Sequence, residues 1–555
     1  MSGLSAVAAR RGPVTAARGG DLTGTVRLLR LMLRRDRLRL PAWVLGMTAM
    51  LAYMTSEVGV LFDEQSPQSM TVFTSNPVVA LVCGPGYGFE AITPARFFVG
   101  LYGVYLMIGA ALMSIMTVSR HTRVEEQTGR AELVRASAVG RHAQLAAALI
   151  LTAGMNAVMG LAMTVAFSAS MIRPDSVAAS ALFACGIAAA GLVFAAVAAV
   201  TSQLSAFSRA ASGGAGAVLA VSFVVRGLGD MSFMQSGGLG WLSWLTPLGW
   251  SQQTAPLVLD RWWPLALSLL ACAVLTCAAF ALQGRRDLAA GILPDRLGAA
   301  RAAAWLRSPV ALALRLQRSA LVWWSVALLV AGVTFGVFVK PMDDGADAMP
   351  AELLQLFGGA EGIVDGFLGF MGVFMSVMIS VFAILAVQGL KAEEQGRRTE
   401  PVLSVAVSRA RWMGAWVVVA GAGCLWLTLV CGLGTAVGAV AATGQGGLWW
   451  PALVSVVVHV PEAWVLLGAG LLLYGVAPRL VGLVWALEVY GAMLTVFGQM
   501  VGLDDAVLAT SVFHHIGQYP AQEVSWGALA LMTVVAAALV GAGIVGLRRR
   551  DLMTV

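Results

Sequence analysis

One stretch of 50 residues, 412–461, contains no Asp, Glu, Lys or Arg. An apolar segment of about 20 residues is long enough to cross the hydrocarbon core of a bilayer as a helix. Apolar residues make up 59% of the 555 residues and charged residues 12%, with a mean hydropathy of +0.81. Ordinary soluble proteins have about 25% charged residues. No soluble fold can bury so much apolar surface, so the sequence predicts an all-α polytopic membrane protein.

Twelve segments have the length and composition of a membrane-spanning helix. A turn-like cluster at 443–447 divides the 50-residue stretch in two. The twelve predicted spans lie near 41–61, 97–119, 143–168, 177–202, 210–228, 262–283, 319–339, 367–390, 412–440, 451–476, 480–502 and 525–547.

The basic residues indicate the orientation of these spans. Of the 36 Lys and Arg residues, 31 fall in the segments that lie on the same side as the N-terminus. Cytosolic loops carry such an excess, so both termini are expected in the cytosol. Five basic residues remain for the external side: Arg96, Arg173, Arg226, Arg261 and Lys340. The net charge of +7 therefore follows the membrane topology and does not indicate binding to nucleic acid.

Two polar motifs occur twice along the chain. Residues 125–141 (EEQTGRAELVRASAVGR) and 393–409 (EEQGRRTEPVLSVAVSR) are identical at nine of 17 positions, and each block follows the second span of its half. The tetrapeptide Arg-Arg-Asp-Leu recurs at 285–288 and 549–552. The sequence thus predicts two fused six-span halves, 1–298 and 299–555. Because each half has an even number of spans, both halves have the same orientation in the membrane.

A basic amphipathic segment precedes the first span of each half. In residues 23–40, arginines recur every three or four positions while leucines occupy another face, which is typical of a helix at the membrane surface. In the second half, Ser308-Pro309 has the form of a helix N-cap, and the amphipathic helix is expected over about 308–318. Two roles stay open: anchoring to anionic lipids alone, or also the transmission of motion.

Catalytic chemistry is missing from the sequence. A P-loop needs Gly-Lys-Ser/Thr, but neither Lys340 nor Lys391 follows a glycine. The five histidines form no HExxH motif, and the cysteines have no metal-ligand spacing. The chain is therefore not expected to be an enzyme or to bind a metal or cofactor itself.

The repeated acidic blocks allow two interpretations. Acids in the first turn and an arginine near the end would stabilise a cytosolic helix through its dipole. That explanation leaves open why the same residues recur while the surrounding apolar sequence differs. A surface that contacts two copies of one cytosolic subunit explains the recurrence better. The residues assigned to it are Glu125, Glu126, Gln127, Arg130, Glu132, Glu393, Glu394, Gln395, Arg398 and Glu400.

Six spans per half, an amphipathic segment before each half, an EEQ block after the second span and a terminal RRDL resemble the permeases of ABC exporters in the type-2 class. The twelve-span form with EEQ…R.E is similar to the tetronasin (polyketide antibiotic) exporter permeases of actinobacteria. Further matches to that family are Asn76-Pro77, the stretch LTPLGW at 245–250 and Ala477-Pro478-Arg479. The resemblance covers nearly the whole chain, although each motif is short.

This resemblance implies a type V ABC exporter fold in the bacterial inner (plasma) membrane and efflux of hydrophobic compounds such as antibiotics. It implies two copies of a separate cytosolic ATPase, which would bind the ATP and Mg. The coupling helices would lie at about 120–141 and 388–409, where Glu125, Glu126, Glu393 and Glu394 would face the ATPase. Arg209 and Arg479, in short loops, would make secondary contacts.

Three ionisable residues interrupt the apolar pattern of the second half. His459 and Glu462 lie one helical turn apart in the tenth span, where Pro461 can bend the helix, and Glu488 lies in the eleventh. A charge at the bilayer centre costs about 2.5–3.5 kcal/mol on insertion scales, so such residues are candidates for function. Two functional roles are open for Glu462: recognition of a cationic or hydroxylated substrate group, or binding of a proton. The structural alternative is that Glu462 is protonated, or is paired with a neighbouring residue such as Arg226 or His459.

The glycine-, proline- and tryptophan-rich stretch 231–261 is expected to form a re-entrant or external hairpin over the transport pathway, with 503–523 as its counterpart. Two rival functions remain. A secondary transporter would use Glu462 or Glu488 for protons but would leave the EEQ repeat unexplained. A membrane scaffold or membrane enzyme is the third hypothesis, and the missing catalytic residues argue against the enzyme.

Overall fold

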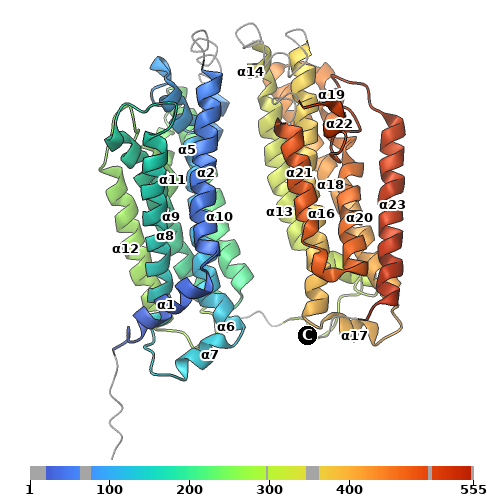
Figure 1. Cartoon of the computed structure of the whole chain (residues 1–555), viewed down its shortest axis with the longest axis horizontal. Helices are drawn as coiled ribbons and strands as arrows, with labels where there is room; N and C mark the ends of the chain where they lie inside the picture. The colour runs from blue at the N-terminus through green and yellow to red at the C-terminus, as the bar shows by residue number, and fades with distance from the viewer. Residues whose placement is uncertain (1–19, 63–76, 295–297, 345–361, 498–502, 552–555) are drawn as a thin grey trace, which may run out of the picture. The chain divides into compact units, whose positions relative to one another are not determined.

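The computed structural model describes residues 20–62, 77–294, 298–344, 362–497 and 503–551. The chain divides into two compact units, Met1–Leu297 (unit 1) and Gly298–Val555 (unit 2). All regular structure in the described residues is helical, and within each unit the long helices run side by side (Figure 1). Asn76 and Leu552, which belong to two of the motifs above, lie outside the described residues.

Unit 1 consists of eleven α-helices, two short 3-10 helices and one π-helical turn in its described part. They are α1 (Thr25–Arg35), α2 (Arg39–Leu61), α4 (Pro77–Val82), η1 (Phe89–Ala91), α5 (Pro94–Ser119), the π-turn η2 (Arg120–Val124), α6 (Glu125–Gln127), α7 (Arg130–Arg135), α8 (Ala143–Ser168), α9 (Val177–Leu204), α10 (Ser208–Met234), η3 (Gly240–Leu245), α11 (Pro247–Gln252) and α12 (Pro264–Gln283).

Unit 2 has the same kind of elements. They are α13 (Pro309–Val337), α14 (Val339–Asp344), α16 (Ile363–Gln395), α17 (Thr399–Leu403), α18 (Arg409–Thr443), η6 (Gly446–Leu448), α19 (Trp449–Val457), α20 (Val460–Val476), η7 (Pro478–Leu480), α21 (Leu483–Phe497), α22 (Asp505–Leu508) and α23 (Trp526–Arg549).

Ten helical segments of the described chain are long and apolar enough to cross a membrane. They coincide with ten of the twelve predicted spans. The helices α2 and α21 lie at the other two positions but are not among the ten, and the described part of α21 has only 15 residues. The structure therefore gives a polytopic helical protein with ten such helices among the described residues.

Local signals in the sequence explain where several helices begin. Ser308 accepts a hydrogen bond from the backbone N–H of Ala311, and Pro309 occupies the first turn of α13. The predicted amphipathic helix at about 308–318 is not separate in the structure, because α13 continues without a break from Pro309 to Val337. In unit 1, by contrast, α1 ends at Arg35 and α2 begins at Arg39.

The predicted tenth span is broken in the middle. The helix α19 ends at Val457, and α20 starts at Val460 with Pro461 in its first turn. Proline has no N–H to donate to the preceding turn, so it stops one helix and starts the next. At the bend expected near Pro461, two turn residues, Val458 and His459, separate α19 from α20, while residues 446–476 together still form one apolar segment long enough to span a membrane.

The two predicted coupling helices also differ from the expectation. In the segment 120–141, a π-turn, the three-residue α6 and the six-residue α7 replace one long helix, and Gly129 separates α6 from α7 with a φ of 72°. In the segment 388–409, α16 continues to Gln395 and is followed by the five-residue α17. Both segments therefore turn back sharply after the acidic pair.

Each unit has its own apolar core. In unit 1, α9 lies at the centre: 78% of its most apolar stretch is buried inside the unit. The helix α12 lies at the periphery, where only 11% of the corresponding stretch is buried. The rings of Phe98, Phe167 and Phe183 join α5, α8 and α9, with centroids 5.2–6.0 Å apart. In unit 2, Phe382, Trp412 and Trp416 are buried between α16 and α18. Small residues let the helices approach closely where no ring fills the space.

The helices α13 and α18 of unit 2 approach each other closely along much of their length. A Cβ atom added to Gly336 would lie 2.2 Å from the carbonyl oxygen of Thr435, and one added to Gly438 would lie 2.3 Å from that of Val333. These distances leave no room for any side chain. Such contacts between small residues stabilise helix pairs in membranes, where lipid is as apolar as the helix surface.

We expect Gly336→Ala to lower the free energy of unfolding by about 1–3 kcal/mol, because the new methyl group forces α13 away from α18. Thermal unfolding of the purified protein in mild detergent measures this change. Gly414→Ala is the matched control, since a Cβ at Gly414 on α18 would meet no atom within 4 Å. Equal stability of the two variants would contradict the packing described here.

Candidate functional site

The first acidic block begins with a buried ion pair. Glu126, in α6, has a side chain that is 5% exposed. Arg286, which follows α12 and belongs to the first RRDL motif, donates to both carboxylate oxygens of Glu126 at 2.7 and 2.9 Å. Arg123 donates to the same carboxylate at 2.8 Å. The bidentate geometry is that of a strong, charge-assisted contact.

The two arginines also reach the end of α9 and the segment after α12. Arg123 donates to the carbonyl of Ser202 and, at 2.9 Å, to that of Ala290. Arg286 donates to Gln203 Oε1 at 2.7 Å. One cluster thus connects the acidic block that follows α5 to the last turns of α9 and to the chain beyond α12.

The second acidic block makes the equivalent contact. Glu394, at the end of α16, occupies the same place in its repeat as Glu126. Arg550 of the second RRDL motif donates to its two carboxylate oxygens at 2.7 Å each, and the Tyr474 hydroxyl donates to it at 2.5 Å. The Arg550 guanidinium also lies 5.0 Å from the centre of the Tyr474 ring. Burial acts to lower the pKa of Arg550, but the hydrogen bonds and the charge of Glu394, together with Tyr474, raise that pKa overall.

The last arginine of each acidic block has a repeated contact as well. Arg141 donates to the carbonyl oxygens of Gln283, Gly284 and Arg286 at 2.9–3.2 Å. Arg409 donates to those of Leu547 and Arg550. These carbonyls lie at or just beyond the C-termini of α12 and α23 and have no partner inside the helix, so the arginines cap both helices.

The two repeated motifs therefore contact each other within each unit, a contact that the sequence does not predict. The sequence instead assigns Glu126 and Glu394 to a surface that faces a partner. Both are buried instead, because each neutralises an arginine from the last helix of its unit. The signal that could have revealed the contact was present: one repeated motif is acidic, the other is basic, and both lie on the same predicted side of the membrane.

Glu125 connects the acidic block to the amphipathic helix α1. Arg35, at the end of α1, forms an ion pair with Glu125. Asp36 is buried and lies 2.9 Å from Arg120 and 2.8 Å from His121 in the π-turn. A π-turn adds one residue to a helix turn and changes the direction of the side chains that follow. The helix α1 is thus attached to the segment that carries Glu126.

The other residues assigned to the partner surface are exposed. In unit 1 these are Gln127, Arg130 and Glu132; in unit 2 they are Gln395, Arg398 and Glu400. Arg209 and Arg479 are also exposed, but they do not lie in loops as expected: Arg209 is in the first turn of α10, and Arg479 is in η7. Glu393 is half-buried and pairs with Arg398 at 2.8 Å, a hydrogen bond that raises the pKa of Arg398. Leu133, between these polar residues on α7, is 76% exposed.

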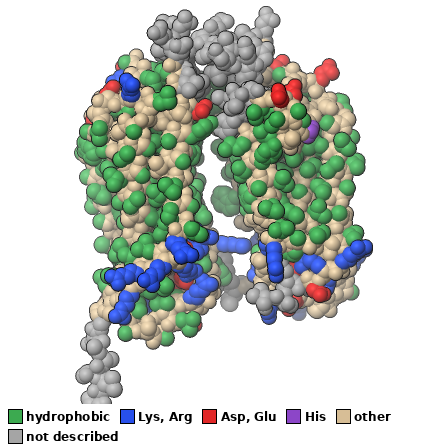
Figure 2. Space-filling view, viewed as in Figure 1, with side chains coloured by type: hydrophobic (Ala, Val, Ile, Leu, Met, Phe, Trp, Pro, Cys, Tyr) green, Lys and Arg blue, Asp and Glu red, His purple; other side chains and the backbone are tan. Residues whose placement is uncertain are grey.

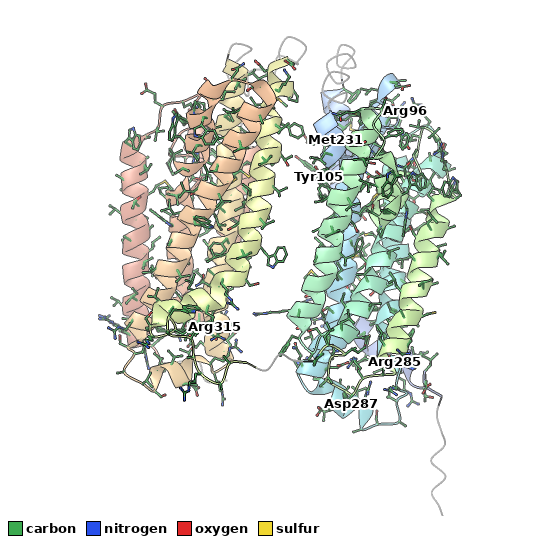
Figure 3. The ribbon with its side chains drawn as sticks, turned by 180° about the vertical axis from the view of Figure 1, so that it is seen from behind. Arg96, Tyr105, Met231, Arg285, Asp287 and Arg315 are labelled. Atoms are coloured by element: carbon green, nitrogen blue, oxygen red, sulfur yellow. The ribbon has the colours of Figure 1, made fainter. Side chains whose placement is uncertain are left out.

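The basic side chains gather at one end of each unit. Figure 2 shows Lys and Arg along the end of unit 1 that carries α1 and α7 and along the end of unit 2 that carries α17. Arg285 and Asp287, which flank Arg286, lie at this end of unit 1, and Arg96 lies at the opposite end (Figure 3). Arg315 lies near the corresponding end of unit 2, in the first turns of α13 (Figure 3).

The ionisable residues predicted inside the membrane come together in unit 2. His459 Nδ1 lies 2.9 Å from Glu462 Oε1, and Ser376 donates to the other oxygen of Glu462. Ser380 lies within 2.9 Å of both oxygens of Glu488. Of the two partners proposed for Glu462, His459 is therefore the one observed. Arg226, the other, pairs with Asp230 in unit 1 instead.

The predicted hairpin at 231–261 begins later than expected, because α10 continues to Met234. It then forms η3 and α11. Arg226 donates to Gln252 at 3.1 Å and to the carbonyls of Leu81 and Val82, and Asp230 accepts from Ser243. These contacts attach the hairpin to α10 and α4. In the described part of the chain, no group of three His, Cys, Asp or Glu side chains is placed to hold a metal ion.

We expect Glu394→Gln to destabilise the protein by about 3 kcal/mol, because the change leaves the guanidinium of Arg550 buried without its counter-charge. Thermal unfolding in mild detergent measures the loss. Glu400→Gln is the control, since Glu400 is exposed on the adjacent α17. If both variants unfold at the wild-type temperature, the ion pair does not support the fold.

The chain was compared with known proteins. The family model "Multidrug efflux system permease Rv1217c, C-terminal domain" matches residues 27–282 and 306–548. The multidrug efflux system permease protein Rv1217c of Mycobacterium tuberculosis is 34% identical over 541 residues, which cover 96% of each chain. Together with the ten apolar helices, these matches identify a multi-pass membrane protein. The chain belongs to the family of multidrug efflux system permeases.

Proposed function

We propose that this chain is the transmembrane subunit of an ATP-driven exporter of the type V class, built from two six-span repeats, with α2 and α21 completing the twelve spans. It would extrude hydrophobic, drug-like compounds, as the name of the M. tuberculosis relative suggests. The observation that carries the proposal is the repeated ion pair, Glu126–Arg286 in unit 1 and Glu394–Arg550 in unit 2.

These ion pairs suit the transmission of force. A cytosolic ATPase that presses on α7 or α17 needs a stiff connection to the membrane helices. In unit 1, the contact made by Glu126 leads directly to the ends of α9 and α12. In unit 2, the contact made by Glu394 leads to α20 through Tyr474 and to α23 through Arg550. Buried, bidentate contacts of this kind hold their geometry better than surface pairs.

The partner surface then consists of the exposed residues around the ion pairs and not of the buried carboxylates. On α7, the exposed Leu133 follows Glu132 and lies three residues after Arg130, so an apolar side chain is available for contact beside two charged ones. On α17, Glu400 is exposed, with Arg398 beside it. Two such surfaces accommodate two copies of one soluble ATPase, which would bind ATP and Mg. The basic ends of both units would face the cytosol, as the positive-inside rule requires.

The proposal predicts that surface changes remove the ATPase one copy at a time. We expect the triple variant Arg130→Glu, Glu132→Lys, Leu133→Asp to retain one ATPase copy, and the double variant Arg398→Glu, Glu400→Lys to retain the other. Combining all five changes should remove both copies and abolish efflux. Mass measurement of the complex, purified from native membranes in mild detergent, counts the copies.

Arg173→Glu with Asp175→Lys is the matched control, because this exposed pair lies in the connection between α8 and α9, at the other end of the α8 helix from α7. It should keep both copies. A wild-type chain that binds no ATPase but still exports drugs would contradict the proposal and favour a secondary transporter. If all five surface changes leave the complex intact, the ATPase docks elsewhere.

A further inference from the structure

Two buried carboxyl groups face the same helix inside unit 2. Glu462 on α20 and Glu488 on α21 contact Ser376 and Ser380, which lie one turn apart on α16. The interruption between α19 and α20 lies immediately before Glu462. Discontinuous helices with polar groups at the break often mark ion or proton sites in membrane proteins. This cluster lies away from the Glu394–Arg550 contact at the end of α16.

The cluster contains two acids and only one base. Glu462 has His459 as a partner, and both side chains are fully buried. Glu488 is 3% exposed and forms no ion pair with any Lys, Arg or His of the described residues. The other acid of the cluster, Glu462, contacts Ser376, one turn away on α16. An ionised Glu488 would therefore be a buried negative charge with no counter-ion among the described residues.

The surroundings of Glu488 make that charge expensive. The side chains packed between α16, α20 and α21 are apolar, and they include Val377, Leu466, Val484 and Phe513. A carboxylate in such a site costs several kcal/mol unless a cation or several hydrogen bonds compensate it. The described structure offers Glu488 one hydroxyl group, that of Ser380.

The hydroxyl of Ser380 is the polar group that the described structure offers to Glu488. Its Oγ lies 2.8 and 2.9 Å from the two oxygens of Glu488 and 2.7 Å from the carbonyl oxygen of Val377. A serine hydroxyl donates one hydrogen and accepts through its lone pairs. If Glu488 is protonated, it donates to Ser380, and Ser380 donates to Val377. If Glu488 is ionised, the single hydrogen of Ser380 must serve both carboxylate oxygens, which is too little to compensate a buried charge.

We propose that Glu488 is a proton-binding site inside the membrane part of unit 2, where the bound proton lets α21 pack against α16. His459 belongs to the same cluster: its Nε2 atom is buried without a hydrogen-bond partner in the described structure, and its Nδ1 serves Glu462. This inference does not depend on the ATPase partner.

Infrared difference spectroscopy tests the proposal directly. A free glutamate has a pKa of about 4.3 and is ionised at neutral pH. We expect the wild-type protein at pH 7 to show a carbonyl stretching band of a protonated carboxyl group. The band should shift in heavy water and should disappear in Glu488→Gln. It should remain unchanged in the control Glu400→Gln, which alters an exposed carboxylate.

The amide of Glu488→Gln can donate to Ser380 as the protonated acid does, so this variant should fold and unfold at the wild-type temperature. Ser380→Ala provides a second test in which the carboxyl group is kept: the same band should move to higher frequency because its hydrogen-bond acceptor is gone. If the wild-type band is absent at pH 7, or persists in full in Glu488→Gln, then Glu488 is ionised and the proposal is wrong.

Discussion

The ion pair between an acidic segment and the end of the last membrane helix is the contact on which the rest of each unit depends. A membrane gives no hydrophobic drive for one helix to bind another, so polar and close-packed contacts must hold the bundle. The peripheral helix α12 has little buried surface in its membrane part. Its connection to the bundle at this end comes from Arg286, which binds Glu126, and from the carbonyls capped by Arg141. The same arrangement joins α23 to Glu394 and Arg409 in unit 2.

The two units use the same contact with different supports. In unit 1, Arg123 adds a second cation to the contact with Glu126. The segment after α12 is also attached to the end of α9, because the backbone N–H groups of Ile292 and Leu293 donate to carbonyl oxygens there. In unit 2, Tyr474 replaces that second cation. In unit 2, Glu462 lies just after the interruption between α19 and α20, and Glu488 is buried on the neighbouring α21. The repeat thus retains this ion pair and varies the interior of the helix bundle, which suits the proposed transporter, whose two halves would meet similar partners but contribute differently to a transport pathway.

The sequence predicted the helices well because their cause is local. Apolar runs, the Ser308-Pro309 cap and Pro461 act through neighbours within one or two turns, so their effect can be read along the chain. Glu126 and Arg286 are 160 residues apart in the chain. The order of residues along the chain does not show whether two such distant positions lie close together in space. The repeated EEQ block is open to misinterpretation for the same reason. Charged residues that recur in both halves indicate that each copy has the same kind of partner. They do not indicate whether that partner is another protein or another part of the same chain. The exposed residues next to it, such as Glu132 and Glu400, remain candidates for the first kind.

The central claim is that the ion pair in each unit carries movement from the cytosolic segment to the last membrane helix. Drug efflux from cells that express charge-reversal variants tests it most directly. Glu394→Arg and Arg550→Glu should each abolish efflux, because each places two like charges together in a buried site, and the double variant should restore a substantial part of it by re-forming the pair in reverse. Protein level in the membrane and copies of bound ATPase must be measured alongside. If the single variants reach the membrane, bind the ATPase and export drugs normally, the ion pair has no part in transport.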